Sequence, residues 1–423
     1  MNPQAATDRS RTEAAIAFGV YVVVLTAAYY YNLTFVQLGL TDIGVERVGL
    51  SPGALAAAMG TLAVATLSVT LVAGSLLDRL GPAVGVRFKF RVLFGVIAAQ
   101  IAATRAVGAV DSPAGFIAWI LAASVLLGTA IPFAFGLLSD LVVPEKRGYA
   151  AGAVTALAFS LAAVFPFRWT AGRFAPAAIA VLVPAGLLLG VLSTPGARPG
   201  RLAHRTRGDA APGSGLSTTT TTTTATVVAG VVLLFGAFFV DSLGFVRIVE
   251  ASRFVDASWQ SPDAGTRGLI ASVHVVGGLA AGVAYAKADH RWLFAAAFAL
   301  FAAAQFLYAY DAVVGGPAVL ATLLSLVYVL AVSCYTTVAF ALWPDLATPG
   351  AVGRYTAVGI GVGGWLATFA STAVALASER SQLPLGGHLL VVAAVSVGFL
   401  CLTAWLLYGD RVAPEGSTPA EAR

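Results

Sequence analysis

The chain alternates between long hydrophobic runs and short polar turns along almost its whole length. A helix needs about 20 apolar residues to cross a hydrocarbon core about 30 Å thick. Only 11% of the residues are charged, against about 25% in an average soluble protein. The pattern predicts an all-α membrane protein with twelve transmembrane helices, at about 14–39, 52–77, 91–110, 114–138, 149–167, 175–194, 226–249, 267–286, 292–310, 317–342, 355–378 and 387–408.

The longest polar interruption divides the twelve runs into two sets of six. It spans about 195–225 and includes an unbroken threonine run at 218–224. Such low complexity cannot build a packed core, so we expect a flexible linker. The predicted units are an N-terminal tail (1–13), two six-helix bundles (14–194 and 226–409) that flank the linker, and a C-terminal tail (410–423).

Weak internal similarity supports this division. Three segments of the first half have counterparts about 205 to 210 residues later, in the same order. An even number of spans in each half returns the chain to the same side, so the halves are expected to be related by an axis along the membrane normal. The paired segments are Leu33–Leu38 with Leu243–Ile248, Ala98–Gln100 with Ala303–Gln305, and Asp140–Tyr149 with Asp345–Tyr355.

The formal charge of +5 has two readings, a nucleic-acid partner or the basic loops of a membrane protein. The placement of the charge favours the membrane. Most of the 25 lysines and arginines fall in segments on one side, if both termini lie in the cytoplasm. We therefore expect a multi-pass protein of the cell membrane with cytoplasmic termini and no nucleic-acid partner. The two cysteines, Cys334 and Cys401, fall inside predicted spans, which argues against a structural disulfide.

A short charged turn follows the second span, with Gly74, Asp78, Arg79 and Gly81 as its main residues. A glycine at position 74 lets a neighbouring helix approach closely, and one at position 81 permits a tight reversal. The carboxylate of Asp78 can face a helix N-terminus or a buried arginine. These residues predict a contact that holds parts of the molecule together on the cytoplasmic side.

A second polar constellation, Asp140, Arg147 and Gly148, follows the fourth span. Its charges complement those of the first turn, so the two are expected to pair. The counterpart of the first turn in the second half has Ala286 where Asp78 would align, which predicts an asymmetric gate carried mainly by the N-terminal half. The alternative is that both constellations only set topology and form turns.

Twelve spans in two parallel halves, with this turn after the second, resemble the major facilitator superfamily of secondary transporters. The signature of that family has a glycine, then Asp-Arg, then a second glycine, and Gly74, Asp78, Arg79 and Gly81 fit it. The departure is Pro82-Ala83, where basic residues are common. The resemblance implies alternating access, a cytoplasmic latch formed by the two constellations, and a central cavity lined by spans 1, 4, 7 and 10.

Ionisable groups inside a span cost about 2.5 to 3.5 kcal/mol on insertion scales, so they need an explanation. Asp241 lies in the seventh span and is either a substrate or proton site, or a carboxylate that reaches the outer surface or pairs with Arg105 or Arg247. His274 in the eighth span is either a proton relay or a histidine that only hydrogen-bonds a neighbour.

Polar and aromatic residues also cluster in the first and tenth spans. Because the resemblance places both spans at the cavity, these clusters are the expected substrate contacts. The alternative for the tyrosines is an interfacial anchor. The candidates are Tyr30 and Asn32, flanked by Tyr29 and Tyr31, and Ser333, Tyr335 and Thr336.

The sequence predicts a monomeric secondary transporter that moves a small polar or amphipathic solute by alternating access. Proton coupling through Asp241 or His274 is a hypothesis that rests on their depth in the membrane. The four histidines are scattered, and neither a metal-ligand spacing nor a paired nucleophile and base is visible, so no metal, no cofactor and no enzymatic activity are expected. The alternatives are a transporter-like sensor and a membrane-embedded enzyme.

Overall fold

The computed structural model describes residues 3–81, 85–165, 171–197, 199–203, 224–249, 251–348, 350–380 and 383–412. Most of the predicted linker and Pro82-Ala83 lie outside these residues. The elements of the first half are α1 (Pro3–Tyr31), η1 (Asn32–Gly39), α2 (Leu40–Asp42), η2 (Ile43–Arg47), α3 (Pro52–Leu80), α4 (Val86–Ala106), η4 (Val107–Ala109), α5 (Pro113–Leu141), α6 (Pro144–Val164), α7 (Ala171–Ser193) and η5 (Pro199–Arg201).

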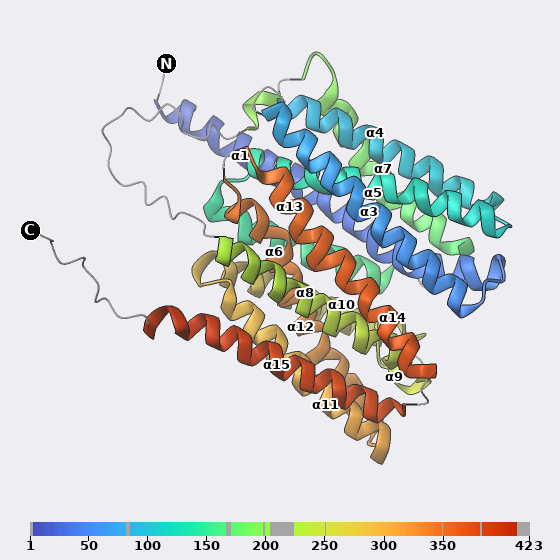
Figure 1. Cartoon of the computed structure of the whole chain (residues 1–423). Helices are drawn as coiled ribbons and strands as arrows, with labels where there is room; N and C mark the ends of the chain where they lie inside the picture. Colours follow the sequence, from blue (N-terminus) through green and yellow to red (C-terminus); the bar gives the residue numbers. More distant parts are fainter. Residues whose placement is uncertain are drawn as a thin grey trace, which may run out of the picture.

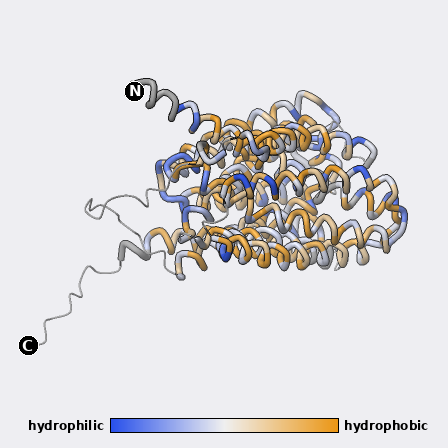
Figure 2. The backbone as a smooth tube through the Cα atoms, turned by 90° about the horizontal axis from the view of Figure 1, so that it is seen from above, coloured by the Kyte–Doolittle hydropathy of each residue, from blue (hydrophilic) through white to orange (hydrophobic). Residues whose placement is uncertain are grey.

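The second half consists of helices alone over the described residues. Figure 2 shows that hydrophobic positions run along the helices of the molecule as a whole. The elements are α8 (Thr224–Ile248), α9 (Ser252–Asp256), α10 (Ala264–Lys287), α11 (Arg291–Val314), α12 (Ala318–Leu346), α13 (Val352–Ile360), η6 (Gly361–Leu366), α14 (Ala367–Arg380) and α15 (Leu385–Val412).

Eleven of the described helices are long and apolar enough to cross a membrane, and the all-helical fold agrees with the prediction. The eleventh predicted span, 355–378, is not one continuous α-helix, because the π-helical segment η6 separates α13 from α14. Three of the six residues of η6 are glycines, which have low helix propensity. The helix α1 begins at Pro3, inside the predicted tail, while its segment apolar enough to cross a membrane begins at Arg11, close to the predicted start at about residue 14.

The two halves lie side by side and meet along two helix pairs (Figure 1). One pair is α3 with α13, and the other is α6 with α10. The beginning of α1 and the end of α15 lie at the same end of the molecule (Figure 1), as an even number of crossings requires.

Glycines allow both helix pairs to approach closely. A Cβ added at Gly74 of α3 would overlap the carbonyl oxygen of Gly353 of α13. In the other pair, a Cβ added at Gly152 of α6 would lie 2.5 Å from the carbonyl oxygen of Gly278 of α10. Only glycine leaves room for such contacts between backbones, so these positions hold the two halves together.

Candidate functional site

A cavity of about 690 Å³ lies between the two halves. Its walls come from α1, α3, α4, α5, α6 and the segment η1 to η2 on one side, and from α8, α10, α12 and the segment α13 to α14 on the other. The lining includes Pro52, Leu55 and Met59 from the first turns of α3. The cavity therefore reaches the end of the molecule at which α3 begins.

The opposite end of the same helices is closed. Gly74 and Asp78 lie more than 20 residues beyond Pro52 along α3, which is over about 30 Å at 1.5 Å per residue. There, Gly74 packs against Gly353. The halves are thus held together at one end and separated by a cavity toward the other.

Aromatic rings from both halves meet in the wall of the cavity. The ring of Tyr29 in α1 lies 4.7 Å from that of Phe340 in α12 and 5.6 Å from that of Phe159 in α6, centroid to centroid. All three residues line the cavity. Edge-to-face packing of this kind adds about 0.5 to 1.5 kcal/mol per pair, so the rings strengthen the contact between the halves.

Asp241 lines the cavity and is held by two tyrosines of α12. The Tyr328 hydroxyl donates to Oδ1 of Asp241 at 2.5 Å, and the Tyr335 hydroxyl donates to Oδ2 at 2.5 Å. Within the described part of the chain, these hydroxyls are its hydrogen-bond partners in place of the arginines considered from the sequence. The two phenols fix the orientation of a carboxylate that faces the cavity.

His274 also lines the cavity, from α10. Its ring stacks on Phe159 with centroids 4.7 Å apart and an angle of 13° between the planes, and its Nδ1 lies 3.3 Å from the Ser333 hydroxyl. The imidazole thus joins α10 to α6 of the other half and to α12. The ring therefore hydrogen-bonds a neighbour and also lies at the cavity, and its role as a proton relay stays a prediction.

The polar residues of α12 divide into two layers. Thr336 lines the cavity. Ser333 is fully buried and Tyr335 is 2% exposed, and both stand behind the lining, where they contact His274 and Asp241 respectively. These two candidates therefore position groups that face the cavity.

The three consecutive tyrosines of α1 point in different directions, since each residue of a helix turns by about 100°. Tyr29 lines the cavity. Tyr30 is fully buried outside the lining, where its hydroxyl donates to the Phe165 carbonyl at 2.6 Å. The sequence therefore singled out the wrong tyrosine as a cavity residue. Asn32, the other candidate in this span, does line the cavity.

The first part of the closed end is a contact between Asp78 and the beginning of α13. The Asp78 carboxylate accepts hydrogen bonds from the backbone nitrogens of Gly353 at 2.8 Å and Arg354 at 2.9 Å. The Arg354 side chain donates a third at 3.1 Å. An acid at a helix N-terminus satisfies free N–H groups and interacts favourably with the helix dipole. Asp78 thus links the first half to the second, while Arg79 beside it is exposed and Gly81 ends α3 with φ +54°.

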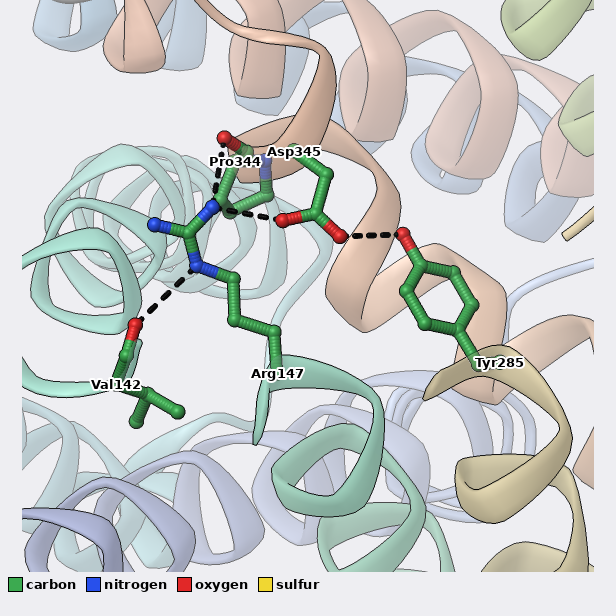
Figure 3. Close-up of polar contacts among 5 residues, drawn as sticks. All are labelled: Val142, Arg147, Tyr285, Pro344 and Asp345. Carbon is green, nitrogen blue, oxygen red and sulfur yellow. Dashed lines mark hydrogen bonds and ion pairs between the residues drawn. The ribbon is translucent and has the colours of Figure 1, made fainter. Parts of the chain in front are cut away.

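The second part is centred on Arg147 of α6 (Figure 3). Its guanidinium donates to Asp345 Oδ1 at 2.7 Å and to the Pro344 carbonyl at 3.1 Å, both in α12. The Tyr285 hydroxyl of α10 donates to Oδ2 of Asp345 at 2.8 Å. This group, with the Asp78 contact, is called the latch below, and every member of it crosses between the halves or supports a group that does.

These contacts correct the predicted pairing of the two constellations. Asp140 pairs with Lys89 of α4 at 2.7 Å, inside the first half. Arg147 pairs with Asp345 rather than with Asp78, because α6 faces the second half at this level. Gly148 contributes close packing, since a Cβ there would lie 2.8 Å from the carbonyl oxygen of Gly282. The latch is therefore shared by both halves and is not carried mainly by the first.

A histidine lies beside the latch without supplying its charge. The ring centroid of His290 is 6.3 Å from that of Tyr285, and its Nδ1 lies 3.5 Å from Asp289. Burial lowers the pKa of His290, although Asp289 opposes this effect. A lowered pKa keeps the imidazole neutral at pH 7, so Arg147, Arg354 and their acidic partners carry the charges of the latch.

Sequence reasoning missed several residues of the site. Tyr328 reaches Asp241 from the wall of α12, and Gln100 lines the cavity from α4. Gln100 was noticed only as part of the internal repeat. Asp345 and Arg354 were likewise seen only as counterparts of Asp140 and Arg147. The repeat was the signal that could have found three of these four residues.

No protein-family model and no curated protein sequence match the chain. Many solved structures are similar to it, among them the following three. A proton:xylose symporter, XylE, bound to 6-bromo-6-deoxy-D-glucose is 14% identical, with a TM-score of 0.64 over 94% of this chain and 96% of that one. The human organic anion transporter MFSD10 is 14% identical, with a TM-score of 0.61 over 95% and 100%.

The third is a bacterial homologue of the iron transporter ferroportin in an outward-facing state. It is 16% identical, with a TM-score of 0.55 over 95% of this chain and 100% of that one. Similarity at this level of identity concerns the fold, and it extends over nearly the whole chain. The chain has the fold of the major facilitator superfamily.

Proposed function

We propose that the protein is a secondary transporter that moves a small molecule across a membrane by alternating access. The observation that carries the proposal is the combination of a cavity between the halves with a closed end made of contacts that can separate. The latch consists of a few hydrogen bonds and ion pairs over glycine contacts, so the halves can rock about the cavity and open it to the other side.

In this proposal the latch lies in the cytoplasm and the cavity opens outward. The basic segments support this orientation, since lysines and arginines accumulate on the cytoplasmic side. Arg87, Lys89 and Arg91 at the start of α4, and Lys146 and Arg147 at the start of α6, lie at the end of the molecule that holds the latch.

The test uses two reporter thiols in a chain whose native cysteines, Cys334 and Cys401, have been replaced. Ala56→Cys places one in the cavity wall. Thr155→Cys places the other at a fully buried position, where the Thr337 hydroxyl donates to that of Thr155 at 3.2 Å across the two halves. Thr155 lies eight residues beyond Arg147 in α6, about 12 Å from the latch.

Alternating access predicts that the reporters respond in opposite directions. A change that opens the latch should speed maleimide labelling of the Thr155→Cys thiol and slow that of the Ala56→Cys thiol. Oxidising a Thr155→Cys, Thr337→Cys pair to a disulfide with an added oxidant should lock the latch end, so the Ala56→Cys thiol should no longer label more slowly when the latch is perturbed. Ala185→Cys is the control, because that residue is fully buried within α7 of one half and should not respond. If both reporters sped up or slowed down together, the rocking of the halves would be disproved.

Proton coupling is part of the proposal, with Asp241 as the proton-carrying group. The support is geometric, since its carboxylate faces the cavity and contacts two neutral phenols. Thiol labelling at Thr155→Cys, normalised to the unfolded protein at each pH, should depend on pH, and Asp241→Asn should remove this dependence. His274→Gln is the parallel test for the histidine. An unchanged pH dependence in Asp241→Asn would exclude Asp241.

A further inference from the structure

The charged side chains that line the cavity are all acidic. They are Asp42 and Glu46 near the open end and Asp241 deeper in the wall. Among the described lining residues there is no lysine or arginine, although the whole chain has 25 basic and 20 acidic residues. The basic excess of the protein is therefore absent from the one surface that a solute would enter.

This distribution of charge favours a positively charged ligand. A wall of low dielectric lined by one sign of charge focuses the field and concentrates counter-ions of the opposite sign. An anion would have to pass the carboxylates of Asp42 and Glu46 and approach that of Asp241, and the described lining offers it no lysine or arginine. A cation is attracted by each of them, and most strongly by Asp241, because the attraction between opposite charges is stronger away from bulk water.

The rest of the lining is mainly aliphatic and aromatic. A ring face attracts a cation that lies within about 6 Å of its centre, most strongly in tryptophan. Two pairs of these rings are stacked, with centroids 5.8 Å apart for Trp365 and Phe369 and 6.1 Å apart for Phe245 and Trp259. The lining aromatics are Tyr29, Phe135, Phe159, Phe238, Phe245, Trp259, Tyr328, Phe340, Trp365 and Phe369. Such a wall suits a ligand with an apolar body.

Several buried side-chain oxygens at the cavity have no hydrogen-bond partner within the described residues, among them two amide oxygens. Gln100 is only 1% exposed and lines the cavity, yet its Oε1 has no hydrogen-bond partner within the described structure. Asn32 also lines the cavity, and its Oδ1 likewise has no hydrogen-bond partner within the described structure. A buried acceptor without a partner costs about 1 to 3 kcal/mol. A ligand with N–H donors would remove this cost.

The lining fits a metal ion or a sugar less well. No group of three or more His, Cys, Asp and Glu residues that could hold a metal occurs among the described residues. Both carboxylate oxygens of Asp241 already accept hydrogen bonds from tyrosines, which suits a single positive charge. A sugar would require many polar partners, whereas the wall is mainly aromatic and aliphatic.

We infer that the cavity binds an amphipathic organic cation, with an aromatic or alkyl body and a protonated amine. This inference rests on the proposed transporter function and specifies the substrate class of the same cavity. The ammonium lies toward Asp241 and the unpartnered acceptors, and the body lies against the aromatic wall.

Three ligands of nearly equal shape test the inference: 4-phenylbutylammonium, 4-phenylbutanol and 4-phenylbutanoate. Each is measured by its ability to protect the Ala56→Cys thiol from maleimide. We expect the ammonium to protect at roughly tenfold lower concentration than the alcohol, which corresponds to about 1.4 kcal/mol, and the carboxylate to be weakest. Equal protection by all three, or strongest protection by the carboxylate, would overturn the inference.

Variants locate the contact. Asp241→Asn should remove the advantage of the ammonium over the alcohol and leave protection by the alcohol unchanged. Gln100→Met should weaken protection by the ammonium by a smaller factor than Asp241→Asn does. Gln305→Met is its control, because Gln305 is the counterpart of Gln100 in the repeat and is fully buried outside the cavity lining.

The ligand series on the unsubstituted cavity decides the sign of the charge even if Asp241→Asn does not fold. The opposite responses of the Ala56→Cys and Thr155→Cys thiols test transport itself without any ligand. If the charge preference fails while the reporters still alternate, only the substrate class is wrong. If the reporters do not alternate, both the proposed transporter function and the substrate class are wrong.

Discussion

The two helix pairs that join the halves use the same close approach but hold it in different ways. In the α3 and α13 pair, Gly74 meets Gly353 and the Asp78 carboxylate binds the beginning of α13 directly. In the α6 and α10 pair, four glycines interlock, at positions 148, 152, 278 and 282. The polar contact beside them involves a third helix, because Arg147 of α6 and Tyr285 of α10 both bind Asp345 of α12.

This difference shows that the missing acid at Ala286 does not weaken the second pair. The repeat preserves the close packing of two helices, whereas each pair satisfies its polar groups with the partners its own neighbourhood offers. The first pair depends on one carboxylate, and the second depends on packing and an ion pair. Substitutions should therefore affect the two helix pairs differently: loss of a carboxylate should disturb the first pair, and added bulk or loss of the ion pair should disturb the second.

The largest effect is expected from Asp78→Ala. It removes the acceptor of two backbone N–H groups and the partner of Arg354, and the loss of a helix cap costs about 1 to 2 kcal/mol. Such a loss shifts a two-state balance roughly tenfold. We expect maleimide labelling of the Thr155→Cys thiol to rise by about this factor and transport to be abolished, while insertion into the membrane is retained.

Asp78→Asn is the matched control, because it keeps one carbonyl acceptor and loses the charge. It should fall between the wild type and Asp78→Ala. Unchanged labelling and normal transport in Asp78→Ala would show that the contact seen at α13 is not part of the gate.

Gly152→Ala tests the second pair through packing. Its Cβ would lie 2.5 Å from the carbonyl oxygen of Gly278 and 2.7 Å from the Cα of Gly282. Overpacking of this kind costs about 1 to 3 kcal/mol, so the thermal midpoint of the purified protein should fall. Gly60→Ala is the control, since a Cβ at Gly60 of α3 has no neighbour within 4 Å. An equal midpoint for the two variants would contradict the proposed role of the interlocking glycines.

A double-mutant cycle measures the ion pair of the second helix pair. Arg147 and Asp345 are 7% and 27% exposed, so each single change, Arg147→Gln or Asp345→Asn, leaves a largely buried partner behind. The coupling between contacting residues is typically about 0.5 to 3 kcal/mol. The double variant should therefore be less impaired than the sum of the singles, measured by labelling of the Thr155→Cys thiol. Strict additivity would mean that the two residues act separately.

Hydropathy predicted the helices well because a bilayer requires about 20 apolar residues for each crossing. It could not predict the partners of Asp78 and Arg147, since these lie more than 190 residues away in the sequence, at Gly353, Arg354 and Asp345. Tyr29 faces the cavity and Tyr30 faces away from it because of how α1 is rotated about its axis. A run of apolar residues does not specify this rotation. The break at η6 was missed because its glycines add no polar or charged side chain, so they do not interrupt the apolar run.

The smallest effect is expected from Ala286→Asp, which supplies the acid that the repeat lacks. Asp78 finds its donors because α13 begins at Val352, so that the N–H groups of Gly353 and Arg354 lie in the first turn and need an acceptor. Ala286 of α10 instead lies beside Gly148 of α6. Because α6 begins at Pro144, four residues earlier, the backbone N–H groups of α6 at this level already donate to carbonyls of α6 itself. A carboxylate there finds no helix N-terminus. Ala286→Asp should therefore change stability by no more than about 0.5 kcal/mol, as surface substitutions do, and a clear gain in thermal midpoint would show that the two pairs are more alike than their helix starts indicate.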